Sequence, residues 1–236
     1  MTQSPKNTDV RALFNTIAPE YDKMNNIISL GTHKLWRQKV MARMTFPEGA
    51  NIIDLATGTA DWALALAEKS DPTAHVTGLD FSEEMLAVGQ KKVDVSDYFD
   101  KITLVQGDAM ALPFADNTFD IVTIGFGLRN LPDPVLGLQE MYRVLKPGGQ
   151  LVILETSQPD NPLVKPFWQL YFGQVMPMFG KLFAKGKYQE YKYLDETTEQ
   201  FMDYRTLGQR LLQVGFEKVT ISRFNLGAAA AHYAVK

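Results

Sequence analysis

The chain has 236 residues, 45% hydrophobic and 22% charged, which is ordinary for one substantial globular domain. The net charge of −3 provides no overall basic field to attract nucleic acid, so no nucleic-acid partner is expected. The absence of cysteine excludes disulfides, thiolate nucleophiles and cysteine-ligated zinc. No metal site is expected either, because the three histidines lack a metal-ligand spacing: His33, His75 and His232.

The first 49 residues are predicted to form a helical cap. Apolar residues recur at helical spacing over 10–17, and Pro19 separates this run from a second one over 21–29, which ends near Gly31. A third helix is predicted over 33–44. The sequence is compatible with a cap packed on a sheet edge and with a lid over a ligand. The N-terminus has no apolar signal core, so a cytoplasmic location is expected.

Residues 50–157 alternate strands with helices and are predicted to form a cofactor-binding core. This rhythm predicts a Rossmann-like, doubly wound α/β sheet with parallel strands. The predicted strands cover 52–55, 75–80, 102–105, 119–126 and 150–155. The predicted helices cover 60–69, the residues after the N-cap Ser82, and 134–145. A Lys-Pro-Gly-Gly turn over 146–149 is predicted to precede the last of these strands.

The pattern changes after residue 157. Residues 158–195 are rich in Phe, Trp, Met and Leu but are broken by Pro and Gly, so they predict an apolar helical insert rather than a membrane-spanning helix. Residues 196–236 predict a last helix and two strands whose short connection makes them antiparallel. These elements are a helix over 197–214 with Gly215 as its stop, and strands over 216–224 and 230–235. The expected architecture is one domain, 1–236, with a seven-stranded sheet that ends in an antiparallel β-hairpin.

The turn after the first strand, D-L-A-T-G-T-A-D over 54–61, is the expected place of a nucleotide-like ligand, because such a turn leaves unpaired backbone N–H groups. A pyrophosphate site requires G-x-G-x-x-G, but only Gly58 is present, with Ala56 and Ala60 in the other places. The turn therefore disfavours an NAD-dependent oxidoreductase. It favours a phosphate-free nucleoside that carries an amino acid, faced by Gly58 and Thr59.

Two aspartates at the ends of later strands are candidate nucleoside ligands. Asp80 ends the second strand, where a carboxylate can bind both hydroxyls of a ribose. Its alternative role as a helix N-cap is already filled by Ser82. Asp108, beside Ala109, follows the third strand and can bond an adenine edge; the alternative is that it only satisfies its own turn.

Three longer motifs occur in order: F-N-x-x-A-x-x-Y-D-x-M-N-N over 14–26, G-F-G-L-R-N over 125–130 and R-V-L-K-P-G-G-Q-L-V-I-L-E-T-S over 143–157. With them the chain resembles the class I S-adenosylmethionine-dependent methyltransferases. More narrowly, it is similar to the quinone C-methyltransferases, which methylate demethylmenaquinone or a ubiquinone precursor. The resemblance implies S-adenosylmethionine as cofactor and a prenylated quinol as substrate, most simply demethylmenaquinol in menaquinone biosynthesis. The cofactor contacts that it implies are Thr59, Asp80, Asp108 and Ala109.

Candidate catalytic residues lie in the second of these motifs. Arg129 follows the central strand, at the edge of the sheet where ligands of such folds bind. A cation there can stabilise an ionised ring hydroxyl, and Asn130 can hold the other ring oxygen. The alternative is that Arg129 pairs with a loop carboxylate such as Asp133. Tyr21 and His33 are secondary candidates for a base or for positioning.

Other functions remain compatible with these patterns. They are a methyltransferase for a different small molecule, an NAD-dependent oxidoreductase, and a non-catalytic module that binds S-adenosylmethionine. If the substrate carries a prenyl tail, the apolar residues of 162–184 predict a path for it and a peripheral membrane contact; the core of the insert is the alternative. The patterns predict no oligomeric state.

Overall fold

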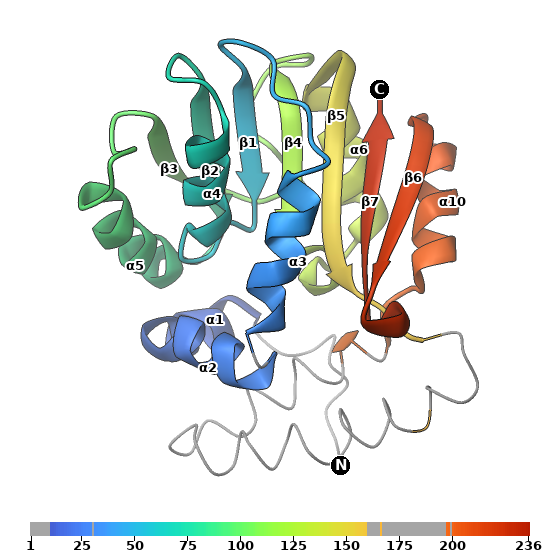
Figure 1. Cartoon of the computed structure of the whole chain (residues 1–236), viewed down its shortest axis with the longest axis horizontal. Helices are drawn as coiled ribbons and strands as arrows, with labels where there is room; N and C mark the ends of the chain where they lie inside the picture. Colours follow the sequence, from blue (N-terminus) through green and yellow to red (C-terminus); the bar gives the residue numbers. More distant parts are fainter. Residues whose placement is uncertain (1–9, 30, 160–165, 167–196, 199) are drawn as a thin grey trace.

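The computed structural model describes residues 10–29, 31–159, 166, 197–198 and 200–236, and this part of the chain forms one seven-stranded sheet (Figure 1). The strand order is β3-β2-β1-β4-β5-β7-β6, with β1 to β5 parallel and β7 antiparallel to both of its neighbours. The strands are β1 (Asn51–Leu55), β2 (His75–Asp80), β3 (Ile102–Gln106), β4 (Phe119–Gly125), β5 (Leu145–Thr156), β6 (Glu217–Phe224) and β7 (Ala229–Val235). The predicted fold, including the antiparallel hairpin at the end, is confirmed.

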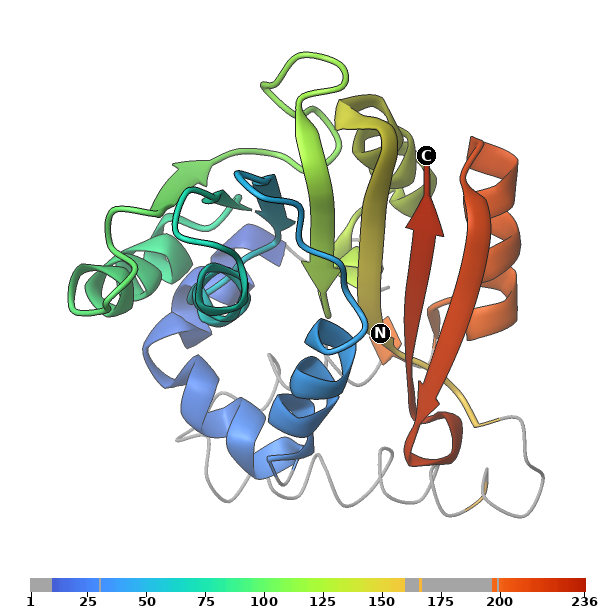
Figure 2. The ribbon, with the colours of Figure 1, turned by 45° about the horizontal axis from the view of Figure 1, so that its top comes forward.

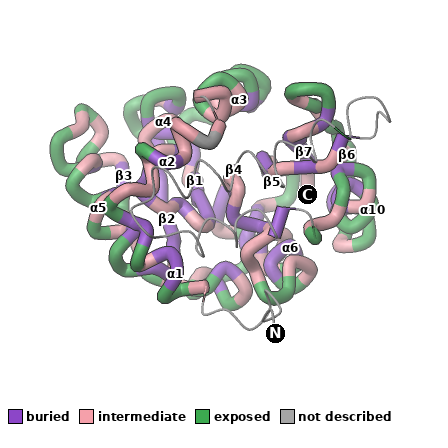
Figure 3. Tube along the Cα trace, turned by 90° about the horizontal axis from the view of Figure 1, so that it is seen from below, coloured by how far each residue is buried: buried purple, intermediate pink, exposed green. Residues whose placement is uncertain are grey.

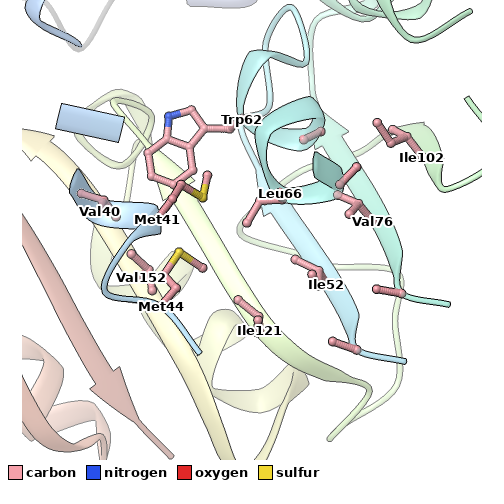
Figure 4. Close-up of a cluster of buried hydrophobic side chains, with 14 of the residues drawn as sticks. Val40, Met41, Met44, Ile52, Trp62, Leu66, Val76, Ile102, Ile121 and Val152 are labelled. Atoms are coloured by element: carbon pink, nitrogen blue, oxygen red, sulfur yellow. The ribbon is translucent and has the colours of Figure 1, made fainter. Parts of the chain in front are cut away.

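Helices cover both faces of this sheet, which explains why its central strands are apolar on both sides. One face carries α3 (Thr32–Met41), α4 (Asp61–Lys69) and α5 (Glu83–Asp94), and the other carries α6 (Pro134–Val144) and α10 (Tyr204–Val214). The close-up in Figure 4 shows Trp62 and Leu66 of α4 packed with Met41 of α3 over Ile52 and Val152. Figure 3 shows the buried residues concentrated on the strands and on the helix sides that face them.

The N-terminal elements lie at the carboxyl ends of the parallel strands (Figure 1). They are α1 (Val10–Ile17), the 3₁₀ helix η2 (Ala18–Glu20) and α2 (Tyr21–Ile28). Phe14, Ile17 and Met24 pack against Met85 of α5 and hold this group in place. Figure 2 shows the arc that the helices describe, from α1 beside α5 to α3 near β5. The helical cap is therefore confirmed, and Gly31, with φ of 73°, separates α2 from α3.

Three element boundaries differ from the predictions by three or more residues. The last helix begins at Tyr204 rather than at residue 197, because Asp203 accepts hydrogen bonds from the N–H groups of Arg205 and Thr206 and so acts as its N-cap. The predicted turn over 146–149 lies inside β5, as a register shift against β4. The third helix ends at Met41, three residues before its predicted end. The predicted insert, 158–195, lies almost entirely outside the described residues.

Candidate active site

A cavity of about 710 Å³ lies where β1, β2, β3 and β4 end, with α1 and α2 contributing to its wall. This volume is typical of a small-molecule site. It brings together most of the predicted site residues: Tyr21, Gly58, Asp80, Asp108, Ala109 and Asn130. Two predicted residues, Thr59 and Arg129, do not line it. The carboxyl edge is where ligands of open parallel sheets bind, so the cavity has the expected place.

The turn after β1 has an alternating backbone. Ala56, Gly58 and Ala60 all take left-handed conformations, with φ of 50°, 55° and 63°. Such a conformation disfavours an alanine by roughly 1–2 kcal/mol, so both alanines adopt the backbone of the glycines that they replace. The ring of Tyr21 covers Gly58: a Cβ built there would lie 3.9 Å from Tyr21 Cε1. The turn is thus shaped as a glycine-rich turn would be, with a methyl group at two of its positions.

Asp80 connects this turn to the start of α5. Its Oδ2 atom accepts a hydrogen bond from the N–H of Gly58 (2.8 Å), and its Oδ1 atom accepts one from Ser82 (2.9 Å). Ser82 Oγ accepts from the N–H of Met85 (3.2 Å), which confirms Ser82 as the N-cap. Burial raises the pKa of Asp80 above its ordinary value, although these N–H groups favour the ionised form. The carboxylate is therefore fixed on the cavity wall with both oxygens oriented.

The loop after β3 supplies the next part of the wall. Asp108 Oδ1 accepts a hydrogen bond from the N–H of Met110 (2.8 Å), so this carboxylate does satisfy its own turn. Asp108 is nevertheless exposed and, with Ala109, lines the cavity. Asp108 can thus satisfy its own turn and still contact a ligand.

Thr59 faces away from the cavity. Its hydroxyl donates a hydrogen bond to Asp22 Oδ1 (2.6 Å) and accepts one from Lys92 Nζ (3.0 Å). Lys92 also pairs with Asp22 and with Asp61 (2.9 Å), and Arg37 pairs with the other oxygen of Asp61 (3.3 Å). The Thr59 side chain therefore joins the turn to α2 and α5. Residue spacing in the sequence could not show that this hydroxyl points away from the cavity.

The turn after β4 is held by close packing. Phe126 has φ of 59°, which is unusual for a bulky residue, and its N–H bonds the carbonyl of Leu154 (2.8 Å). A Cβ at Gly125 would lie 2.6 Å from Trp62 Nε1, and one at Gly127 would lie 2.4 Å from the Cβ of Ala56. Both glycines of the G-F-G-L-R-N motif are thus required by neighbours that leave no room for a side chain.

Arg129 follows in the short 3₁₀ helix η3 (Leu128–Asn130), and its side chain is bound to a residue that the sequence patterns did not single out. Its guanidinium pairs with Glu155, at the end of β5; the exposed fractions of the two side chains are 9% and 2%. The partner considered from sequence, Asp133, instead caps α6 through the N–H groups of residues 135 and 136. Arg129 Nε and Asn130 Oδ1 are buried and have no hydrogen-bond partner within the described part of the chain. The feature of the sequence that could have indicated Glu155 is an acidic residue at the end of an apolar strand.

The pKa shifts of the two residues considered as bases have opposite directions. Burial raises the pKa of Tyr21, so its hydroxyl stays protonated at neutral pH and can donate a hydrogen bond into the cavity. Burial, aided by the positive charge of Arg37, lowers the pKa of His33. His33 Nδ1 lies 2.5 Å from Ser29 Oγ, and the residue does not line the cavity. Tyr21 therefore lines the cavity with a protonated hydroxyl, whereas His33 lies in α3, outside the cavity lining.

In the described ranges, no group of three or more His, Cys, Asp or Glu side chains is arranged to hold a metal ion. No helix within the same ranges has the length and apolar character needed to cross a membrane.

With this geometry established, comparison with known proteins decides the family. A model of the ubiE/COQ5 methyltransferase family matches residues 1–236. The chain belongs to this family. A demethylmenaquinone methyltransferase of Lactiplantibacillus plantarum is 56% identical over 228 residues, covering 97% of this chain and 96% of the relative. One of Listeria monocytogenes is 48% identical over 236 residues, covering 100% and 98%.

Solved structures share the fold of this methyltransferase. A SAM-dependent methyltransferase from Aquifex aeolicus is 20% identical with a TM-score of 0.61, covering 84% of this chain and 88% of that one. One from Thermotoga maritima, described as a possible histamine N-methyltransferase, is 18% identical with a TM-score of 0.66, covering 96% and 99%. At these identities the likeness shows the fold alone.

S-adenosylmethionine is the cofactor of this methyltransferase, and the cavity fits it. Asp80 offers a fixed carboxylate for a ribose, and Gly58, which has no side chain of its own, lines the cavity beside the ring of Tyr21. Apolar side chains such as Phe81 and Met85 line the same space and suit a purine ring. Among the described residues, the buried Oδ1 of Asn130 has no hydrogen-bond partner, so it is an acceptor that a ligand would satisfy.

Proposed function

We propose that this methyltransferase transfers a methyl group to a ring carbon of demethylmenaquinol and so produces menaquinol. The observation that carries the proposal is the full-length similarity to relatives named demethylmenaquinone methyltransferase, 56% identical over 97% of the chain. Conversion of a prenylated ubiquinone precursor or of another small molecule is the second candidate, since the sequence motifs over 14–26, 125–130 and 143–157 also resemble those of methyltransferases that act on a ubiquinone precursor.

The reaction requires a nucleophilic ring carbon. A carbon beside a ring hydroxyl becomes nucleophilic when that hydroxyl is ionised, and for a phenol of pKa near 10 this costs roughly 4 kcal/mol at neutral pH. S-adenosylmethionine supplies an electrophilic methyl group and a positive charge. The new carbon–carbon bond forms as the sulfur–methyl bond breaks, and the ring carbon then loses its proton to solvent, which restores the aromatic ring.

We assign the cofactor side of the cavity to the residues at the ends of β1, β2 and β3. The carboxylate of Asp80 would bind the ribose hydroxyls, and Gly58 would lie against the amino-acid part. Asp108 and Ala109 would contact the adenine. Thr59 would act indirectly, because its hydroxyl bonds Asp22 and Lys92 and so fixes the turn.

We assign the substrate side to Asn130, Tyr21 and Arg129. Asn130 would hold one ring oxygen, and the protonated hydroxyl of Tyr21 would donate a hydrogen bond to the ionised one. A lone cation at about 4 Å contributes roughly 4 kcal/mol at an effective dielectric near 20, but pairing with Glu155 offsets part of the charge of Arg129. The positive charge of Arg129 still acts on a residue of the cavity wall: burial raises the pKa of Tyr21, and the smaller effect of Arg129 lowers it. Arg129 would therefore supply part of the stabilisation and anchor the turn that carries Asn130.

A methyl-transfer assay with labelled S-adenosylmethionine tests the proposal. Demethylmenaquinol, a ubiquinol precursor and menaquinol, whose target carbon is already methylated, are compared with the same protein preparation. We expect turnover of demethylmenaquinol and none of menaquinol. Turnover of the ubiquinol precursor alone would transfer the assignment to the other quinone branch. A thermal shift with S-adenosylhomocysteine but none with NADH separates a methyltransferase from an oxidoreductase.

A prenylated substrate also needs an apolar environment for its tail. We propose that residues 162–184 provide it and make a peripheral membrane contact from the cytoplasmic side; the sequence of this segment supports the proposal, and it lies almost wholly outside the described residues. Co-sedimentation with liposomes, before and after apolar residues of 162–184 are changed to polar ones, measures this contact. Equal sedimentation of both proteins would contradict it.

A further inference from the structure

We propose that Glu155 is a positioning residue for methyl transfer: by holding Arg129 through both of its carboxylate oxygens, it fixes the turn that presents Asn130 to the substrate. The inference rests on the proposed function, since it assumes that Asn130 contacts the substrate ring. Its basis is a buried carboxylate, 2% exposed, that lies outside the cavity lining and beside two buried polar atoms for which the described residues provide no hydrogen-bond partner.

Glu155 binds Arg129 through both of its carboxylate oxygens. Its Oε1 atom accepts from the guanidinium of Arg129 and from the N–H of Thr156 (2.8 Å). Its Oε2 atom accepts from the backbone N–H of Arg129 (3.3 Å). One carboxylate therefore binds both the side chain and the main chain of a single residue. This arrangement needs acceptors at both oxygens, which a glutamine does not offer.

The backbone N–H that Glu155 binds belongs to the residue directly before Asn130, inside the three-residue helix η3. Within the described ranges, the hydrogen bonds of Asn130 itself stay in its own turn: its N–H donates to the carbonyl of Gly127 (3.1 Å) and its Nδ2 to the carbonyl of Phe126 (3.3 Å). The hydrogen bonds from Phe126 to Leu154 and from Arg129 to Glu155 connect this turn to β5. Of these two bonds to β5, the one to Glu155 is thus closer to Asn130 along the chain.

Two polar atoms next to Glu155 have no hydrogen-bond partner among the described residues. They are the buried Oδ1 of Asn130 and the buried Nε of Arg129, whereas both oxygens of Glu155 accept hydrogen bonds. Buried polar atoms in native structures rarely lack partners, so an unpaired acceptor on the wall of a cavity indicates a group that a ligand satisfies. A shift of the turn by about 1 Å would move this acceptor off the reacting molecule, and such a displacement can reduce a rate roughly 100-fold.

The test is Glu155→Gln, with Glu140→Gln as the matched control. Glu140 also binds an arginine, Arg143, and a backbone N–H, that of Leu112 (2.8 Å), but neither partner belongs to the turn that carries Asn130. We expect Glu155→Gln to lower kcat roughly 10- to 100-fold and to leave the Kd for S-adenosylhomocysteine, measured by calorimetry, within about threefold of the wild type. Glu140→Gln is expected to keep kcat within about threefold. A purely structural role would affect both variants alike and would not separate kcat from cofactor affinity.

A mutant cycle identifies the residue through which Glu155 acts. If it acts through Asn130, the double variant Glu155→Gln, Asn130→Ala loses little more activity than Asn130→Ala alone. Multiplied losses, or an unchanged kcat in Glu155→Gln, overturn the proposal. If Glu155→Gln does not fold, Thr156→Val, which removes a hydroxyl bonded to Oε1 (3.2 Å), is expected to lower kcat about three- to tenfold, and an unchanged kcat overturns it. A wild type that binds S-adenosylhomocysteine but does not methylate demethylmenaquinol refutes the proposed function instead.

Discussion

Asp54, at the end of β1, is a buried carboxyl group whose ionisation we expect to lower the stability of the protein. It is 1% exposed, and its two oxygens accept hydrogen bonds from the hydroxyls of Thr57 and Thr123, each at 2.6 Å. Burial raises the pKa of Asp54 from its ordinary 3.8 to about 7, although these hydroxyls and the charge of Arg37 favour the ionised form, and the nearby Asp80 disfavours it. The perturbation that removes this charge is Asp54→Asn.

The sign follows from proton binding. Between about pH 4 and pH 7 the folded protein binds the proton at Asp54 more tightly than the unfolded chain does, so stability is highest at the acidic end and falls as pH rises. A shift of about 3 units corresponds to about 4 kcal/mol at pH 7 and above. An asparagine keeps the packing, because a threonine hydroxyl can accept from its amide instead of donating. We therefore expect Asp54→Asn to gain up to about 4 kcal/mol relative to the wild type between pH 4 and pH 8.

Urea unfolding followed by tryptophan fluorescence at several pH values measures this difference. Asp120→Asn is a control for which we expect the opposite change in the free energy of unfolding. Burial alone would raise the pKa of Asp120, but hydrogen bonds from Lys146 and from the N–H of Asn51 lower it below its ordinary value. Removing that carboxylate should therefore lower stability near neutral pH and have less effect in acid. A free-energy difference for Asp54→Asn that does not change with pH would refute the reasoning.

Four further predictions concern the site. Gly125→Ala should lower the free energy of unfolding by about 1–3 kcal/mol in urea, since its Cβ would meet Trp62 Nε1 at 2.6 Å; an unchanged midpoint contradicts the packing argument. Asp80→Ala should weaken S-adenosylhomocysteine binding about 10- to 100-fold by calorimetry, and equal affinity would remove Asp80 from the cofactor site. Arg129→Ala should keep that affinity near normal while methyl transfer collapses; unchanged turnover would exclude its role. Lys92→Met should lower stability by under about 1 kcal/mol per lost ion pair, an effect that shrinks in high salt, as these side chains are about a third exposed.

Much of the fold could be predicted because its signals are local. The helix over 10–17 and the strand over 75–80 have the predicted bounds, since each is one uninterrupted period of apolar residues. The start of the last helix was missed because Asp203 lies within an amphipathic pattern that continues on both sides of it. Only the bonds from its carboxylate to the following N–H groups show that the helix begins there.

The candidate site also has contacts that could be predicted from the sequence and contacts that could not. Asp80 and Gly58 could be predicted as neighbours, because the carboxyl ends of adjacent parallel strands meet at one edge of the sheet. The pair of Arg129 and Glu155 could not, since it depends on the register that places Leu154 opposite Gly125. The direction of the Thr59 hydroxyl depends on the backbone on either side of it, and no residue pattern specifies that.

The contact between Ala56 and Gly127 makes the two halves of the cavity interdependent. Each belongs to a different turn, one after β1 and one after β4, and between them there is space for a single methyl group. A larger residue at either position must therefore displace the opposite turn, so pocket size on the two sides cannot be varied separately. Redesign of this enzyme for a different acceptor molecule would have to treat positions 56 and 127 as one unit, with the methyl group placed on one or the other.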